Sequence, residues 1–169
     1  MELEKSKTCC FSGHREMSIG EKKCAVECVL DLISELYEKG YRHFITGGAL
    51  GFDTVAAVAV LTARDTKFPD ITLTLAIPCP DQTAKWSEKD KQNYKRIMMS
   101  ANESVLLSAS YTPYCMHQRN RWMVDHSSAI VCYCHTEKGG TYSTVNYAKK
   151  SRIAVMNIAY LDKMRAFYE

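Results

Sequence analysis

The sequence of 169 residues predicts an α/β fold: a Rossmann-like, doubly wound, mainly parallel sheet of about six strands in three layers. Short apolar runs alternate with longer stretches whose apolar residues recur every three or four positions, which is the pattern of strands alternating with helices. Two of the short runs end close to glycine pairs that open into helical stretches. Strands that alternate with helices form right-handed crossover units, and these produce parallel sheets.

The elements are expected in a regular order along the chain. Ser87 with Asp90 resembles a capping box at the start of a helix, and Gly40 ends the first helical pattern. We expect one domain over 1–169, with a core at 8–157 and a C-terminal tail at 158–169 to which no structure is assigned. Strands are expected at 8–12, 43–46, 71–77, 103–107, 128–134 and 152–157. Helices are expected at 20–39, 50–64, from 87 onward and 115–126, and the segment 137–150 is expected to carry the glycine loop GGT and then a helix.

Composition limits the possible classes of protein. The net charge is +3, with 24% charged and 46% hydrophobic residues. This mild balance does not indicate a nucleic-acid-binding protein, although it is compatible with a local basic patch. The sequence lacks a long apolar run and a secretory signal, which predicts a cytoplasmic protein without a membrane partner. The eight cysteines are then expected to be thiols. Cys132, Cys134 and His135 are candidate metal ligands, but no second ligand pair completes a site, so no metal is predicted.

The segment 45–57 carries the strongest local signal. A strand leads through a glycine-rich turn directly into a helix, where backbone N–H groups and the helix dipole favour a phosphate. The segment is neither a complete G-x-G-x-x-G nor a P-loop, and a tight turn that needs glycine is the alternative. The candidate ligand-binding residues of this segment are Thr46, Gly47, Gly48, Gly51 and Asp53.

The segment 139–144 repeats the same arrangement between a strand and a helix. Its glycines free the backbone and its hydroxyl groups are donors near a helix N-terminus, although ordinary helix capping is the alternative. The candidate residues are Gly139, Gly140, Thr141, Ser143 and Thr144. A third candidate loop follows the first strand and contains Ser12, Gly13, His14 and Arg15, of which the arginine can pair with a phosphate or carboxylate.

Two further segments supply polar or aromatic candidates. Arg119 and Arg121 point to different sides of a helix, so one can reach a cleft while the other forms a structural contact. Asn120 can hydrogen-bond a base, a ribose or a loop. After the third strand, Pro78, Gln82 and Trp86 are candidate contacts, with packing as the alternative for the tryptophan.

Catalysis has weak candidates only, and the sequence leaves enzymatic activity undecided. His14, Asp53 and Glu137 are the side chains considered for acid–base chemistry, together with Asp125. Asp53 falls in a first helical turn, where a carboxylate also suits the helix dipole. A dehydrogenase is disfavoured, because no carboxylate ends the strand near Ala76–Cys79, where a ribose-binding acid would be expected.

The ordered set SGHR, TGGALGFDTVAA, IPCPDQTAKW, RNRWMVD and GGTYSTVNYA resembles the YpsA-like branch of the SLOG superfamily, over roughly residues 8–157. That superfamily also contains DNA-processing protein A and the LOG phosphoribohydrolases. The resemblance implies a Rossmann-like fold with a nucleotide pocket, and a sensor or regulator more than a dedicated enzyme. It also implies that Asn146 stands where LOG enzymes carry their glutamate, and an amide cannot act as a general base.

We therefore expect a sensor or regulatory module that binds a nucleotide or a derivative such as ADP-ribose or NAD, with no certain cofactor. One alternative is a hydrolase acting on the N-glycosidic bond of a nucleotide. Another is a single-stranded nucleic-acid binder that uses Arg119, Arg121, Lys149 and Lys150 with Trp86. A homo-oligomer stays open.

Overall fold

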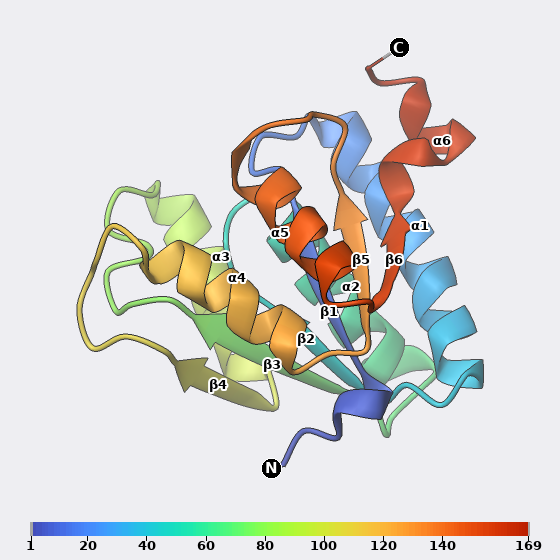
Figure 1. Cartoon of the computed structure of the whole chain (residues 1–169), viewed down its shortest axis with the longest axis horizontal. Helices are drawn as coiled ribbons and strands as arrows, with labels where there is room; N and C mark the ends of the chain where they lie inside the picture. The colour runs from blue at the N-terminus through green and yellow to red at the C-terminus, as the bar shows by residue number, and fades with distance from the viewer. Residues whose placement is uncertain (1, 169) are drawn as a thin grey trace.

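The computed structural model describes residues 2–168 (Figure 1). The strands are β1 (Thr8–Gly13), β2 (His43–Thr46), β3 (Thr72–Ile77), β4 (Glu103–Leu106), β5 (Ala129–Tyr133) and β6 (Ala154–Asn157). The helices are α1 (Ile19–Glu38), α2 (Phe52–Thr66), α3 (Glu88–Ser100), α4 (Cys115–Asp125), α5 (Gly139–Lys150) and α6 (Asp162–Arg165). Two single 3-10 turns, η1 (Lys5–Lys7) and η2 (Ile158–Tyr160), complete the described elements.

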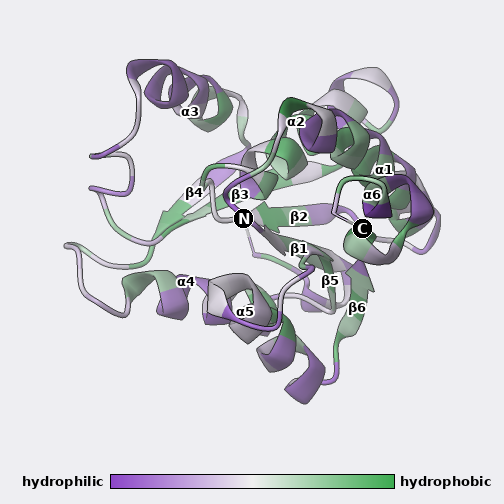
Figure 2. Ribbon diagram, turned by 90° about the horizontal axis from the view of Figure 1, so that it is seen from above, coloured by the Kyte–Doolittle hydropathy of each residue, from purple (hydrophilic) through white to green (hydrophobic). Residues whose placement is uncertain are grey.

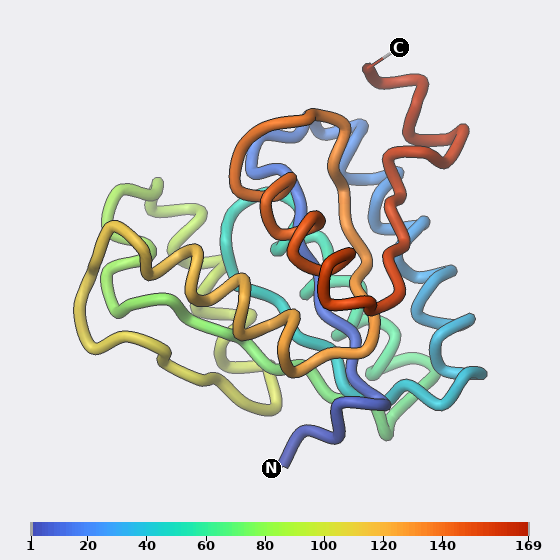
Figure 3. Tube along the Cα trace, viewed as in Figure 1, coloured from blue at the N-terminus to red at the C-terminus, as the bar shows by residue number. Residues whose placement is uncertain are grey.

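The strands form one six-stranded sheet in the order β4-β3-β2-β1-β5-β6, and every neighbouring pair is parallel. The predicted Rossmann-like α/β fold is confirmed. The chain moves from β1 toward β4 on one side and then returns to place β5 on the other side of β1. The direction of winding therefore switches between β1 and β5, where ligands of such sheets bind beyond the strand ends. The loops after these two strands run side by side (Figure 3), and the His135 N–H donates to His14 Nε2 at 3.0 Å.

Helices cover both faces of the sheet. Seen from above, α1, α2, α3 and α6 lie on one face, and α4 and α5 lie on the other (Figure 2). Their sheet-facing sides are mostly hydrophobic and their outer sides mostly hydrophilic, as expected for amphipathic surface helices. Along β1, Cys9 and Phe11 pack toward α1 and α2, whereas Cys10 packs toward α4 and α5. Each strand thus contributes to two cores, because successive side chains point to opposite faces.

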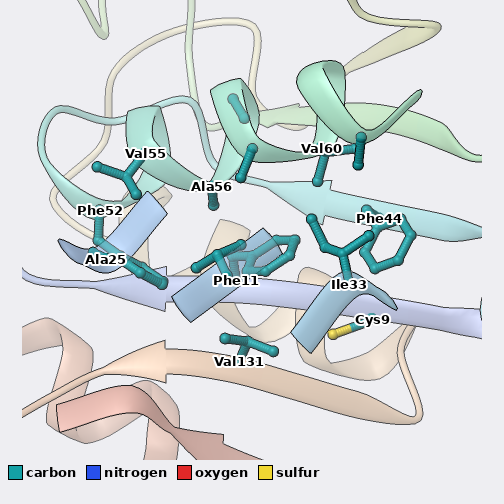
Figure 4. Close-up of a cluster of buried hydrophobic side chains, with 14 of the residues drawn as sticks. Cys9, Phe11, Ala25, Ile33, Phe44, Phe52, Val55, Ala56, Val60 and Val131 are labelled. Carbon is teal, nitrogen blue, oxygen red and sulfur yellow. The ribbon is translucent and has the colours of Figure 1, made fainter. Parts of the chain in front are cut away.

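The larger core lies between the sheet and the helices α1 and α2 (Figure 4). The ring of Phe11 lies 6.0 Å from that of Phe44 and 6.4 Å from that of Phe52, and all three rings are fully buried. Alanines such as Ala25 and Ala56 let the two helices approach the sheet closely. This packing fixes the carboxyl end of β1 and the start of α2, which both border the site described below.

Helix starts follow the capping chemistry of the sequence. Ser87 accepts a hydrogen bond from the Asp90 N–H at 3.1 Å, as its spacing predicts. The first helix begins one residue earlier than expected, because Ser18 is the N-cap and forms a complete capping box with Glu21. Within residues 2–168, the structure contains no helix with the length and hydropathy needed to cross a bilayer.

The residues after 157 form η2 and α6 and add to the core. Ile158, Ala159 and Met164 are almost or fully buried against the α1 side of the sheet. The Cys24 thiol of α1 also donates to the Lys163 carbonyl at 3.4 Å. The packed part of the domain therefore extends past residue 157. The apolar residues of this segment are too few to show a helical or strand periodicity in the sequence, yet they pack into the core.

Candidate functional site

A cleft of about 440 Å³ lies at the carboxyl ends of β1 and β5, at the switch in winding direction. Four segments meet there: the loop after β1, the start of α2, the start of α4 and the first turn of α5. The residues that line the cleft are Ser12, Gly13, His14, Arg15, Ala49, Asp53, Pro113, Met116, His117, Arg119, Asn120, Lys138, Gly139, Gly140 and Thr141.

The first turn of α5 forms one wall of this cleft. The segment 139–144 is expected as a loop, but the helix already begins at Gly139, with Lys138 as its N-cap. Lys138 makes no capping hydrogen bond through its side chain. The first N–H groups of a helix lack partners within the helix, so the turn that contains Gly140 and Thr141 offers backbone donors and the positive end of the helix dipole to the cleft.

Gly140 has no packing reason to be glycine. A Cβ atom added at Gly140 would meet no heavy atom within 4 Å, and its backbone does not have a positive φ. A glycine in a helix costs about 1 kcal/mol relative to alanine. Gly140 lines the cleft, so a larger side chain at this position would extend into open space there.

The glycine loop after β2 has a different role. A Cβ atom at Gly47 would clash with Nη1 of Arg119 and lie 2.7 Å from Oδ2 of Asp53. Gly47 is therefore glycine because these two side chains close over it. The Ala49 N–H donates to Oδ2 of Asp53 at 3.2 Å, and the carboxylate also accepts a backbone hydrogen bond from Gly47. The Ala49 amide of this loop is therefore already engaged by a carboxylate of the protein itself.

Arg119 and Asp53 form a buried charged network behind the cleft. Only 3% of Arg119 and 6% of Asp53 is exposed. The guanidinium donates to the Gly47 carbonyl at 2.6 Å and to Oδ1 of Asn120 at 2.8 Å. Burial raises the pKa of the Asp53 carboxyl, and the positive charge of Arg119 opposes that shift. Burial likewise lowers the pKa of Arg119, and Asp53 opposes it. Arg119 of α4 and Asp53 of α2 both contact the loop Gly47–Ala49, which ties the two helix starts together, and their opposite charges offset each other at the cleft wall.

The candidates after β3 lie behind this network. Gln82 is 8% exposed and its Oε1 accepts from Nη1 of Arg119 at 3.4 Å. Trp86 packs edge-on against Tyr94, with ring centroids 5.5 Å apart. Pro78 is buried at the end of β3. None of these residues lines the cleft, so the structure supports packing for Trp86 and a supporting contact for Gln82.

Other candidates are divided between the cleft and its surroundings. Ser12, Gly13, Arg15 and Asn120 line the cleft, and Arg15 is exposed there. The remaining candidates do not line the cleft. The hydroxyl of Thr46 donates to the Asp53 carbonyl at 3.2 Å, and that of Thr144 donates to the Gly140 carbonyl at 2.8 Å. Gly48 and Gly51 lie outside the cleft lining, and Ser143 lines a groove between α4 and α5.

The carboxylates other than Asp53 lie outside the cleft. Glu137 and Asn146 line a different cavity, on the β6 side of α5. Asp125 accepts a hydrogen bond from the Tyr147 hydroxyl at 2.8 Å. Among residues 2–168, no cluster of histidine, cysteine and acidic side chains is arranged to hold a metal ion, and the eight cysteines are free thiols.

His14 is held by the neighbouring loop. Its Nε2 accepts the His135 N–H, so its Nδ1 carries the proton of the neutral ring. Burial, and then the charge of His135, lower the pKa of His14 below its ordinary value of 6.5, while Glu21 opposes the shift. His14 is therefore a neutral acceptor that joins the loops after β1 and β5.

Replacing His14 by glutamine is expected to reduce the loss of stability on acidification. The folded protein binds a proton at His14 less readily than the unfolded chain, so stability is retained above pH 6.5 and falls as the pH drops through 6.5 toward the lower folded pKa. Glutamine keeps an acceptor but does not titrate. Urea midpoints of both chains, between neutral pH and about pH 5.5, measure the difference. His43, whose pKa is also lowered by burial, contributes equally to both chains and cancels. Identical pH profiles would contradict the assignment.

The sequence does not predict five residues of the cleft: Ala49, Pro113, Met116, His117 and Lys138. His117 precedes Arg119 by two positions, and Lys138 directly precedes the glycine pair. A basic residue immediately before a glycine-opened helix is a readable signal for an anion site. Pro113 and Met116 carry no such signal, because only the packing of α4 against α5 brings them to the cleft.

The chain is similar to known proteins over most of its length. It is 36% identical over 136 residues to the uncharacterized SPbeta prophage-derived protein YoqJ of Bacillus subtilis strain 168, covering 73% of this chain and 79% of that protein. It is 26% identical over 106 residues to the UPF0398 protein YpsA of the same organism, covering 62% of this chain and 58% of that protein.

Solved structures share the fold at low sequence identity. DNA processing protein A from Helicobacter pylori matches with a TM-score of 0.62 and 19% identity, covering 90% of this chain and 65% of that chain. The Streptococcus pneumoniae protein of the same name matches with a TM-score of 0.68 and 16% identity, over 95% and 53%. A molybdenum cofactor binding protein from Rippkaea orientalis matches with a TM-score of 0.54 and 18% identity, over 89% and 74%.

The chain thus spans only part of several relatives, and little more than half of the Streptococcus pneumoniae chain. The sequence pattern that implies the SLOG resemblance extends across the whole sheet, including both strands that border the cleft. The sequence model of the YpsA family, the YspA SLOG family, matches residues 9–165, and the chain therefore belongs to this SLOG family.

Proposed function

We propose that the cleft binds a nucleotide or nucleotide derivative, such as ADP-ribose or NAD, with a phosphate at the first turn of α5. The observation that carries this proposal is the open space at Gly140, on an uncapped helix N-terminus that faces the cleft. Arg15 and Lys138 add positive charge to the same cleft. At the start of α2, which carries the strongest sequence signal, the Asp53 carboxylate already accepts the Ala49 N–H.

We further propose a sensing or regulatory role in preference to hydrolysis. Asp53 is engaged by backbone N–H groups and by the charge of Arg119, and Nε2 of His14 is engaged by His135. Glu137 lies outside the cleft, on the far side of α5. An acid–base mechanism needs a carboxylate or imidazole that can reach the scissile bond, so these contacts favour positioning roles for Asp53 and His14.

A panel of AMP, ADP-ribose, NAD and inorganic phosphate, measured by isothermal titration calorimetry, tests the proposal. Lys138→Gln is expected to weaken binding of the best nucleotide about tenfold, in line with the loss of one charge-assisted hydrogen bond. Lys150→Gln is the matched control, because it removes the same charge from the other end of α5, outside the cleft. Absence of binding by every nucleotide of the panel, or an equal loss in both variants, would contradict the proposal.

Single-stranded nucleic acid is the second candidate ligand, because a basic groove continues from the cleft. This groove, between α4 and α5, is lined by His117, Arg121, Tyr147 and Lys150, and His117 also lines the cleft. The Arg121 guanidinium lies over the Tyr147 ring, 4.8 Å from its centroid. Basic grooves with aromatic rings suit single strands. DNA processing protein A from Helicobacter pylori, which shares the fold, binds single-stranded DNA.

Arg121→Glu separates the two candidates. If a strand follows the groove, the variant is expected to weaken oligothymidine binding and to reduce the salt dependence of its affinity by about one phosphate contact. Fluorescence anisotropy over a range of salt concentrations measures both quantities. AMP binding to the cleft is expected to be unchanged in the same variant. An unaltered salt slope would remove the groove as a path for nucleic acid.

A further inference from the structure

A second cavity, of about 550 Å³, lies on the other side of α5 from the cleft. Its walls come from the loop after β5, from α5, from β6 and from the C-terminal segment 158–168 (Figure 1). The volume falls within the range of small-molecule pockets. The residues that decide its chemistry are His135, Tyr142, Asn146, Lys149, Tyr160 and Tyr168.

Aromatic rings dominate one part of this wall. The rings of His135 and Tyr168 are stacked, with centroids 4.5 Å apart and planes inclined by 14°. This stack joins the loop after β5 to the end of the chain, and the phenols of Tyr142 and Tyr160 line the same cavity. Aromatic rings in a partly open pocket favour a flat ligand, because planar groups gain both stacking and area burial against them.

Positive charge lies beside the rings. Lys149 lines the cavity and is exposed, and it forms no ion pair with any residue between 2 and 168. Arg165 also lines the cavity, and among the described lining residues Glu137 is the one with a carboxylate. Asn146 adds an amide that can donate or accept a hydrogen bond. A flat ligand that carries an anionic group would satisfy both features of the lining.

The C-terminal segment makes this cavity a part of the fold. Met164 is fully buried, and a Cβ atom at Gly20 of α1 would lie 2.8 Å from the Phe167 ring. The wall that carries Tyr168 is thus packed against α1 as well as stacked on His135. Such anchoring holds the aromatic wall in place before any ligand binds, which lowers the entropic cost of binding.

We propose that this cavity is a second binding site, for a planar ring that carries a phosphate or similar anion. It is distinct from the cleft, although the two share a boundary: His135 lines the cavity, and its N–H donates to His14, which lines the cleft. Free nucleotides and the phosphorylated end of a nucleic-acid strand both offer this chemistry. The proposal does not depend on a ligand in the cleft.

The test uses the full chain carrying Gly140→Glu, which is designed to close the cleft. AMP, adenosine and inorganic phosphate are titrated separately, and ¹⁵N–¹H spectra are recorded. We expect saturable shifts at the amides of His135, Lys149 and Tyr168, with AMP binding more tightly than adenosine or phosphate, because only AMP combines the ring with the anion. Adding Lys149→Glu is expected to weaken AMP binding at least tenfold.

Lys150→Glu is the matched control, because the same charge changes one residue along the helix but faces the groove between α4 and α5. Absence of saturable shifts with AMP, or an equal loss in the Lys149 and Lys150 variants, would overturn the proposal. A short 5′-phosphorylated oligothymidine distinguishes the sources: tighter binding than AMP assigns a strand end, and weaker binding assigns free nucleotides. The unmodified chain reports on the cleft through Gly139–Thr141, so failure at one site is separable from failure at the other.

Discussion

Gly140→Glu is expected to weaken nucleotide binding in the cleft about a hundredfold, or about 2.8 kcal/mol. The new carboxylate would occupy the open space above the first turn of α5 and repel a phosphate there. The same change should raise the free energy of unfolding by about 0.5–1 kcal/mol, because glutamate is a better helix residue than glycine and its charge suits a helix N-terminus. Calorimetry with AMP and urea unfolding measure the two effects.

Ser143→Glu is the control for this variant. It adds the same charge to the same helix, but Ser143 lines the groove between α4 and α5. Binding of AMP should fall only slightly. Opposite effects on binding and stability are specific to an anion site at Gly140, whereas a general disturbance of α5 would weaken both. Unchanged AMP affinity in Gly140→Glu would be incompatible with a phosphate at this turn.

Arg119→Met is expected to lower the free energy of unfolding by about 3–5 kcal/mol. The variant leaves the Asp53 carboxylate buried without its positive neighbour and removes the donor to the Gly47 carbonyl. The pKa of Asp53, already raised by burial, should rise further. Above the ordinary carboxyl pKa of 3.8, the unfolded chain releases a proton that the folded variant keeps on Asp53. The free energy of unfolding of the variant should therefore fall as the pH rises from 3.8 toward the raised pKa of the folded state. Urea unfolding at several pH values measures both effects.

A double-mutant cycle with Asp53→Asn tests the coupling between the two charges. Removing both charges is expected to cost less than the sum of the single losses, because neither buried group is then left unpaired. The asparagine can still accept the Ala49 N–H that Asp53 accepts in the parent chain. Additive losses would show that Arg119 and Asp53 act independently, against the network described above.

Much of the fold could be predicted from the sequence, because parallel strands buried on both faces read as short apolar runs. Cys9 to Phe11 and Ala129 to Tyr133 are fully buried, and both segments are found by their composition. The C-terminal segment could not be assigned in this way. Ile158 and Met164 are six residues apart, and only contact with α1 and β5 makes them core residues.

The candidate site could be predicted in location but only in part in chemistry. The order of strands and helices predicts that the loops after β1 and β5 meet at one edge of the sheet. Ser12, Arg15 and Gly140 could therefore be predicted as residues of the cleft. The two glycine loops could not be distinguished by sequence, because both follow a strand and open a helix. The difference comes from Arg119, 72 residues from Gly47, whose side chain closes over the first loop and leaves the second open.

A crystal structure of the AMP complex tests the central claim most directly. We expect the phosphate within hydrogen-bond distance of the Gly140 and Thr141 amides, with Arg15 and Lys138 beside it. A phosphate held instead by the loop Gly47–Ala49, with the Asp53 carboxylate displaced, would contradict the claim, as would a cleft left empty at saturating AMP.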